Sequence, residues 1–423
     1  MLMLAAAGAL SARLLTIGAG IQAAAPPQEV VAEIRVHGNH ISTDEDVIAL
    51  SGLHVGAPFT STTIADVTDR LRAAKKFEKV TVLKRFASIS DASQIIVVIL
   101  VDEGPVRLDV PDVPGAPIRA VKRRGFHNLM WMPILSGEDG YGLTYGVQLA
   151  WPGLFGERSR VSFPLTWGGF KQAGAEIDRS FTSGPITRFD VGGSLQSQHN
   201  PAFDADDNRR RLYGRVERAM GVVRVAGDAA WEHVSFLGTE NTQHSFGGEV
   251  TVDTRVDPVL PRNAIYGTAS AEQVFIDQGP TITLTHLEAR GYIGLFRQMT
   301  AMVRVERRDA SDPLPFYLKW LLGGNSTLRG FEAGSFIGDT AVNGTLEVRV
   351  PLTSPLEIGK LGVSIFADTG KAYNKDQRFA DQPYHTGVGA SVWMAATAFQ
   401  MSLAVAHGLG ASTRVNFGIG IGF

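Results

Sequence analysis

The final ten residues of the chain alternate strictly between apolar side chains and small or polar ones. Asn416 and three glycines lie on one face of an extended strand, and the other face carries Val415, Phe417, Ile419, Ile421 and Phe423. This pattern is typical of a strand between lipid and a polar lumen, and the last aromatic suits an interfacial girdle. Because every backbone group in lipid must be paired, such a strand spans a membrane only within a closed barrel.

The same pattern recurs from residue 128 to the end of the chain. Tilted strands of roughly ten residues cross a bilayer. We predict sixteen antiparallel strands, at 128–135, 141–151, 158–167, 171–181, 187–197, 209–219, 222–235, 243–254, 265–275, 281–295, 300–308, 341–350, 361–368, 386–395, 398–407 and 413–423. Long polar joins at 198–208, 309–340 and 369–385 follow odd-numbered strands, and tight turns follow several even-numbered ones. Short periplasmic turns and long outer loops have this asymmetry, so both chain ends are expected in the periplasm.

Residues 1–25 read as a secretory signal peptide. Arg13 precedes an apolar run at 14–21, and small residues follow it. A helical or disordered extension is the alternative. No transmembrane helix is expected after residue 30. The chain has no cysteine, so no disulfide framework is expected, and its net charge of -2 argues against a nucleic-acid partner.

Residues 29–104 predict a separate small domain, followed by a linker at 105–127. Strands are predicted at 32–36, 79–84 and 95–101, and helices at 43–50 and 62–75, which gives the order β-α-α-β-β. This order, with Gly38-Asn39 after the first strand and the segment 76–80 at the second, resembles a POTRA domain. The resemblance implies that the domain binds extended client segments by adding a strand to a sheet edge. A rigid spacer below the barrel is the alternative.

Inward positions of the predicted barrel are unusually charged. Arg304, Glu306 and Arg308 share one face of their strand, and so do Glu347 and Arg349. The strand at 281–295 places His286, Glu288, Arg290 and Tyr292 on the same side. Charges of both signs on one wall either line a hydrated pore or hold an inserted loop through charge-assisted hydrogen bonds.

Four motifs occur in order along the barrel. The long segment 309–340 contains Gly-Gly-Asn-Ser-Thr-Leu-Arg-Gly-Phe at 323–331, the strand at 361–368 leads into Phe-Ala-Asp-Thr-Gly at 366–370, and Leu-Glu-Val-Arg-Val-Pro-Leu stands at 346–352. Residues 252–262 carry Asp-Thr-Arg-Val-Asp-Pro, with an aspartate shifted by one position. Together these resemble the BamA/TamA family of outer-membrane assembly proteins, which includes bacterial surface antigen barrels, and the related two-partner secretion transporters.

The resemblance implies specific roles for these residues. The loop-six clasp would consist of Leu328, Arg329, Gly330 and Phe331, and its lumen partners would be Glu347, Phe366, Asp368 and Gly370. Arg329 would enter the lumen and meet Asp368 and Glu347, Gly330 would allow a tight bend, and Phe331 would pack on the wall. A clasp that only stabilises the barrel is the alternative.

The first and last predicted strands both carry residues that weaken pairing. Glycines stand at 418, 420 and 422, and Pro133 removes a ladder hydrogen bond from the first strand. In the resembled family, insertion is attributed to a weak seam between these strands. The alternative is that these glycines only relieve crowding inside the barrel. The assembly signal is expected at Phe417, Ile419, Ile421 and Phe423.

The expected function is therefore insertion or translocation of proteins at the outer membrane. Its expected partners are unfolded outer-membrane or secreted clients, outer-membrane lipids and accessory periplasmic proteins. An export pore of the two-partner type and a passive channel or receptor are the alternatives. No enzyme is expected, because Gly-Gly-Ser-Leu-Gln at 192–196 lacks the last glycine of a nucleophile elbow. No cofactor or metal is expected: His37 and His40 have no third ligand nearby, and the acidic segment 204–207 departs from calcium-loop spacing.

Overall fold

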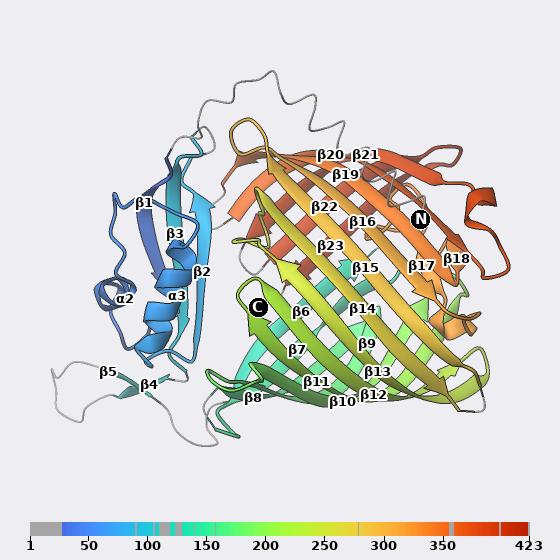
Figure 1. Cartoon of the computed structure of the whole chain (residues 1–423), viewed down its shortest axis with the longest axis horizontal. Helices are drawn as coiled ribbons and strands as arrows, with labels where there is room; N and C mark the ends of the chain where they lie inside the picture. Colours follow the sequence, from blue (N-terminus) through green and yellow to red (C-terminus); the bar gives the residue numbers. More distant parts are fainter. Residues whose placement is uncertain are drawn as a thin grey trace.

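In the computed structural model, a wide β-barrel lies beside a small α/β domain, which stands at one mouth of the barrel (Figure 1). The structure describes residues 28–88, 91–104, 106–109, 119–122, 129–138, 140–156, 158–277, 279–354, 359–396 and 399–421. The expected signal peptide, and Phe423 of the expected assembly signal, lie outside these residues. No helix in the described part of the chain is long and apolar enough to cross a membrane.

The N-terminal domain has the predicted order of elements. These are β1 (Val30–His37), α2 (Asp44–Ser51), α3 (Thr63–Ala73), β2 (Lys79–Phe86) and β3 (Gln94–Asp102). The sheet order is β1-β3-β2, in which β1 runs parallel to β3 and β2 runs antiparallel to it. Both helices lie on the same face of this sheet (Figure 1).

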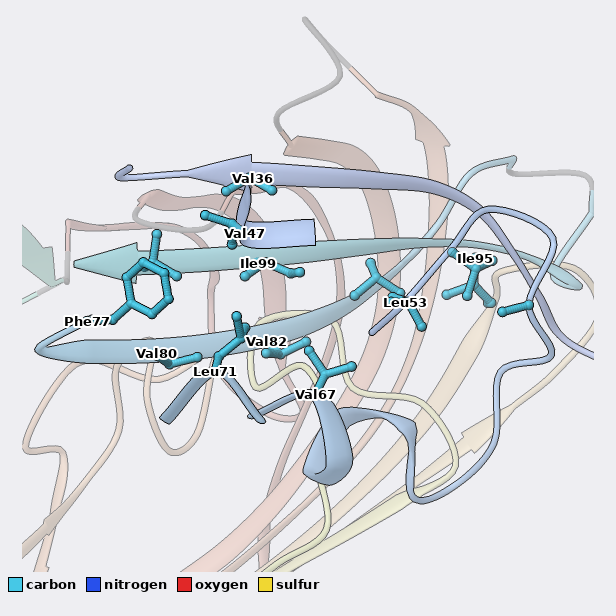
Figure 2. Packing of buried hydrophobic residues seen from close by; sticks show 14 residues of the cluster. Val36, Val47, Leu53, Val67, Leu71, Phe77, Val80, Val82, Ile95 and Ile99 are labelled. Carbon is cyan, nitrogen blue, oxygen red and sulfur yellow. The ribbon is translucent and has the colours of Figure 1, made fainter. Parts of the chain in front are cut away.

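Local sequence explains why the helices form where they do. Thr43 and Asp46 form a capping box at the start of α2, and Gly52 ends that helix with a φ of 68°. On α3, Val67 and Leu71 are buried four residues apart, so they form one apolar stripe. Figure 2 shows this stripe packed onto the sheet, where alternate residues of β2 and β3 complete a single core.

Sixteen strands close the barrel, as predicted. They are β6 (Met130–Glu138), β7 (Gly142–Pro152), β8 (Ser159–Gly168), β9 (Phe170–Ser180), β10 (Arg188–Asn200), β11 (Ala205–Met220), β12 (Val223–Phe236), β13 (Thr239–Asp253), β14 (Ala264–Ile276), β15 (Thr281–Gly294), β16 (Thr300–Ala310), β19 (Thr340–Thr353), β20 (Gly359–Tyr373), β21 (His385–Ala396), β22 (Phe399–Gly408) and β23 (Thr413–Ile421). All neighbours in the barrel pair antiparallel, which is required when short turns join successive strands.

Side chains alternate between the two faces of the barrel wall as predicted. On β16, Val303 and Val305 are exposed on the outer face, whereas Glu306, which points inward, is only 3% exposed. An apolar outer face suits lipid, and charged inner positions are stable only where they find partners inside the barrel.

Three connections differ from the prediction. Residues 198–208 are mostly strand, because β10 and β11 continue as an extended hairpin with a short turn at 201–204. Their alternating polar residues were therefore wrongly interpreted as a long loop. The linker at 105–127 contains two short paired strands, β4 (Val106–Asp109) and β5 (Arg119–Lys122). The segment at 309–340 contains a second small hairpin, made of β17 (Trp320–Leu322) and β18 (Phe336–Gly338).

Candidate functional site: the lumenal loop and the barrel seam

The signature segment forms the tip of the β17–β18 hairpin, and this tip packs against the inner wall of the barrel. Within the tip, the Thr327 hydroxyl accepts from the Gly323 N–H at 3.0 Å and donates to the Gly323 carbonyl at 2.8 Å. The Gly324 N–H also donates to the Phe331 carbonyl at 3.0 Å. These bonds close the tip into a compact turn, so its side chains reach the wall in a fixed arrangement.

Arg329 lies at the centre of this contact. Its Nε donates to Asp368 Oδ2 at 2.7 Å and its Nη2 donates to Asp368 Oδ1 at 2.9 Å, so the guanidinium binds the carboxylate with two prongs. Its Nη1 donates to Glu347 Oε2 at 3.1 Å. The backbone N–H of Arg329 also donates to Asp368 Oδ2, at 3.1 Å. The structure thus places together the arginine and the two carboxylates that the sequence suggested.

Burial strengthens the ion pairs of this cluster and makes the loss of either partner costly. The Arg329 side chain is 12% exposed and that of Asp368 only 1%. The Phe366 ring covers the guanidinium, whose central carbon lies 3.4 Å from the ring centroid. Glu347 is shared with Arg349, whose Nε donates to it at 2.8 Å. Two arginines therefore balance two carboxylates, which is the condition under which buried charges are tolerated.

The other clasp residues fix the loop by packing. Leu328 is fully buried, and Gly330 has a φ of 96°, a conformation that side-chain-bearing residues rarely adopt. Phe331 makes edge contacts with Phe336 and His385 at centroid distances of 5.2 and 5.8 Å. Gly370 is different: a methyl group built on it would first meet Val342 and Asn343 on the neighbouring strand, and not the loop.

A second charged cluster extends along the wall beside the clasp. Glu306 accepts hydrogen bonds from Arg308 at 2.7 Å and from His286 at 2.9 Å, and it also pairs with Arg304. Arg304 reaches the loop as well, since its Nη1 donates to the Ser326 carbonyl at 3.0 Å. The inward charges thus hold the inserted loop. Some open lumen remains, because a cavity of about 750 Å³ lies between the loop and the wall.

The seam between β23 and β6 is the shortest junction of the barrel. Its register joins only Ile419 to Gly137 and Gly420 to Ser136 in the described part of the chain. By contrast, β22 and β23 stay paired along the whole range from Phe399 to His407. The strands are staggered, so the C-terminal end of β6 lies beside the C-terminal end of β23, and no further pair joins the two strands within the described residues.

The expected assembly-signal residues lie on this seam strand. Phe417 is 42% exposed on the outer face of β23, and Ile419 takes part in the seam register. The backbone of Ile421 pairs with Phe399. These positions fit a lipid-facing strand, while a signalling role stays a prediction.

Two charged residues of the site escaped sequence reasoning. Asp339 is 1% exposed and holds the base of the hairpin, because it accepts from Lys319 Nζ at 2.7 Å and from the Leu314 N–H at 2.7 Å. Asp257, the aspartate shifted by one in its motif, forms an ion pair with Arg85 of the N-terminal domain. Asp257 and Arg85 belong to different domains, and Asp339 meets Lys319 across the base of an irregular connection, 20 residues apart. No periodic pattern in the sequence indicates either pair.

No group of three or more His, Cys, Asp or Glu side chains that could hold a metal ion occurs among the described residues. The imidazole of His199 lies 3.4 Å from Asp204 and 3.5 Å from Asp206 at the β10–β11 turn, and all three side chains are largely exposed. The contacts that the lumenal site does show are ion pairs, hydrogen bonds and aromatic packing.

A closed sixteen-stranded barrel with a lumenal arginine clasp and an N-terminal β-α-α-β-β domain defines an outer-membrane barrel of the kind that carries POTRA domains. Residues 137–423 match the Omp85 superfamily domain, and residues 30–88 match a POTRA domain of the FtsQ type. The chain belongs to the Omp85 superfamily. It is an integral protein of the outer membrane, with its POTRA domain in the periplasm, and it falls among barrels with general roles in insertion or translocation of proteins.

Solved structures show the same fold. A BamA structure from Haemophilus ducreyi lacking POTRA domains 1–3 has a TM-score of 0.61 and 12% identity, over 93% of this chain and 84% of that one. CdiB from Escherichia coli has a TM-score of 0.53 and 12% identity, over 95% and 92% of the two chains. None of the curated proteins matches this chain. At these identities, the likeness concerns the fold alone.

Proposed function

We propose that this protein inserts client proteins into the outer membrane through the seam between β23 and β6, without catalytic chemistry. The seam register carries this proposal, because it joins β23 and β6 at only two residue pairs among the residues that the structure describes. Each paired strand residue in lipid satisfies backbone groups that otherwise cost several kcal/mol, so opening a short seam is far less unfavourable than opening any other junction. An opened seam exposes two strand edges to which a client strand can pair.

The POTRA domain offers a matching edge for client capture. Sheet order leaves the outer edge of β2 without a partner strand among the described residues. The start of β1 is covered instead, since the Val31 N–H donates to the Ala57 carbonyl at 2.9 Å and the Gly56 N–H donates to the Val31 carbonyl at 2.8 Å. Figure 1 shows β2 on the side of the sheet that faces the barrel. A client strand added to β2 would therefore stand next to the barrel mouth.

The test is to lock the seam. Because the chain contains no cysteine, Ser136→Cys and Gly420→Cys create a single disulfide across one seam register pair. A matched control, Val405→Cys with Val415→Cys, joins β22 to β23 at a register pair away from the seam. In liposomes, the oxidised seam variant should stop assembling an unfolded barrel client, and reductant should restore assembly. Equal assembly by the oxidised and reduced seam variants would refute the seam route.

Translocation through the lumen is the second candidate, and the cavity of about 750 Å³ is the observation that favours it. Export through this space requires the clasp loop to leave the lumen, while the seam stays closed. The locked-seam variant separates the two routes: it abolishes insertion but leaves export of a secreted client unchanged.

A further inference from the structure

The tip of the lumenal loop touches the last barrel strand. A methyl group built on Gly418 of β23 would lie 2.5 Å from the Asn325 side-chain nitrogen and 3.0 Å from Ser402 Oγ. The Asn325 amide thus rests on bare backbone, which is possible only because residue 418 has no side chain. Gly387 and Gly408 play the same part on the two preceding strands, where the backbone of Arg329 and Gly330 approaches closely.

The other end of the tip reaches across to the first strand. Ala333 packs against Gly140, in the turn between β6 and β7, so closely that a methyl group on Gly140 would overlap the Ala333 methyl. The residue beside it, Glu332, faces Arg414 of β23, with 3.7 Å between Oε1 and Nη2. Segment 325–333 therefore contacts both sides of the seam.

These contacts fall where the seam lacks backbone pairing. From the pair of Ile419 with Gly137, β23 continues toward the outer end of the barrel, but β6 ends one residue later, at Glu138. The outer half of β23, residues 413–418, consequently has no partner on β6 in the described structure. The loop lies against this half from inside the barrel, where Asn325 meets Gly418 and Glu332 faces Arg414. Asn416, between these two contacts on the same face, is completely buried.

We propose that segment 325–333 is a brace across the seam, in which Asn325 and Ala333 are positioning residues that hold β23 and the β6–β7 turn in the closed arrangement. The brace replaces strand pairing with side-chain packing, which is released without breaking a ladder of hydrogen bonds. Its purpose, keeping the seam shut until a client arrives, rests on the proposed function; the brace itself does not.

The glycines of β23 make the proposal testable within one strand. Gly418 and Gly420 share the inner face of β23, and alanine changes strand propensity equally at both. A methyl group on Gly420 would meet nothing within 4 Å, whereas a methyl group on Gly418 displaces Asn325. Gly420→Ala is therefore a matched control for Gly418→Ala.

Hydrogen exchange of the purified full-length protein, followed by mass spectrometry in detergent without client, measures seam opening directly. We expect Gly418→Ala to speed exchange of β23 and of β6 by about tenfold, equivalent to about 1.4 kcal/mol in the opening equilibrium. Exchange of β11 and β12, far from the seam, should not change. Gly420→Ala should exchange like the unmodified protein.

Asn325→Ala removes the same contact from the loop side and adds no atoms, so it decides the question even if Gly418→Ala fails to fold. It should also speed exchange at the seam, and the double variant should be no faster than either single one, because both remove one interaction. Equal exchange in Gly418→Ala and Gly420→Ala, or unchanged exchange in Asn325→Ala, would overturn the brace. Since no client is present, this outcome is independent of the insertion assay.

Discussion

Arg85 at the end of β2 and Asp257 in the turn after β13 form a buried ion pair between the POTRA domain and the barrel. Their side chains are 14% and 6% exposed. Burial lowers the pKa of Arg85 to about 10, so the guanidinium stays charged at neutral pH. Close by, Lys360 Nζ lies 3.5 Å from the Phe86 carbonyl. These contacts hold one end of β2 against the periplasmic mouth.

Breaking this pair should release the POTRA domain. Arg85→Ala leaves Asp257 buried without its cation, and loss of one partner of a buried pair costs roughly 3–5 kcal/mol. Spin labels on Glu45→Cys and Arg297→Cys, both exposed positions, should report one narrow distance in the parent protein and a broad distribution in Arg85→Ala. The swap Arg85→Asp with Asp257→Arg should restore the narrow distance. An unchanged distribution in Arg85→Ala would show that other contacts position the domain.

The clasp should behave as one unit. Arg329→Ala and Asp368→Ala should each lower the temperature at which the barrel unfolds on a heat-modifiability gel, because each leaves an opposite charge buried, at roughly 3–5 kcal/mol. The double variant should be little worse than either single variant, since the groups interact. Arg329→Lys should rescue poorly, because an ammonium cannot reproduce the two-pronged contact with Asp368. Simple addition of the two single effects would contradict the clasp.

Asn416 predicts a stabilising substitution. Its side chain is fully buried, and neither its Oδ1 nor its Nδ2 has a hydrogen-bond partner in the described structure. An unsatisfied buried polar group costs about 1–3 kcal/mol, and an apolar side chain of similar shape avoids this cost. Asn416→Leu should therefore raise the unfolding temperature of the barrel, while Asn416→Ala should gain less because it leaves a cavity. A lower unfolding temperature for Asn416→Leu would contradict this prediction and would indicate that the amide has a partner inside the barrel.

Glu103 should make the POTRA domain sensitive to acid. Burial raises the pKa of its carboxyl, but hydrogen bonds from Ser42 and from the backbone N–H groups of residues 40–42 outweigh burial and lower the pKa below the ordinary 4.5. The folded pKa is thus below the unfolded one. The stabilisation is complete above about pH 4.5 and is lost as the pH falls through the lowered value.

Glu103→Gln should remove this stabilisation at neutral pH, by about 1–3 kcal/mol. Hydrogen exchange of residues 28–104 in the full-length protein measures the effect, and the variant should show a smaller loss of protection between neutral and acidic pH than the parent. Glu33→Gln is the control, since its partner Arg35 is a surface neighbour two residues away. An equal acid response in parent and Glu103→Gln would refute the role of this carboxylate.

The sequence predicted the barrel well because alternation, strand length and pairing are all local in a meander. All sixteen strands occur close to their predicted places, and alternation placed Asp368 and Glu347 on the inner face. The entry of Arg329 into the lumen was implied by the family resemblance and not by the pattern of the strands. Register was not predictable. The stagger that leaves Ile419 opposite Gly137 depends on the shear of the closed barrel, which no single strand encodes.

Contacts between residues that lie far apart in the sequence could not be predicted either. The glycines at 418 and 420 look alike in the sequence and were interpreted together as weakening the strand, yet only Gly418 receives the loop. Asp257 stood out as a misplaced motif residue, but its partner Arg85 lies in another domain. Charged residues outside the alternating strands, such as Asp257, meet their partners only in the folded protein, so the sequence alone does not indicate these pairs.

The stagger of the seam also has an energetic consequence for the last strand. Residues 413–417 of β23 run past the last residue of β6, so this edge has no partner strand among the described residues. In lipid each unpaired backbone group is unfavourable by several kcal/mol. A foreign strand that pairs with this edge satisfies such groups from its first hydrogen bonds onward. In the reaction we propose, strand pairing at this edge therefore supplies free energy for the first step.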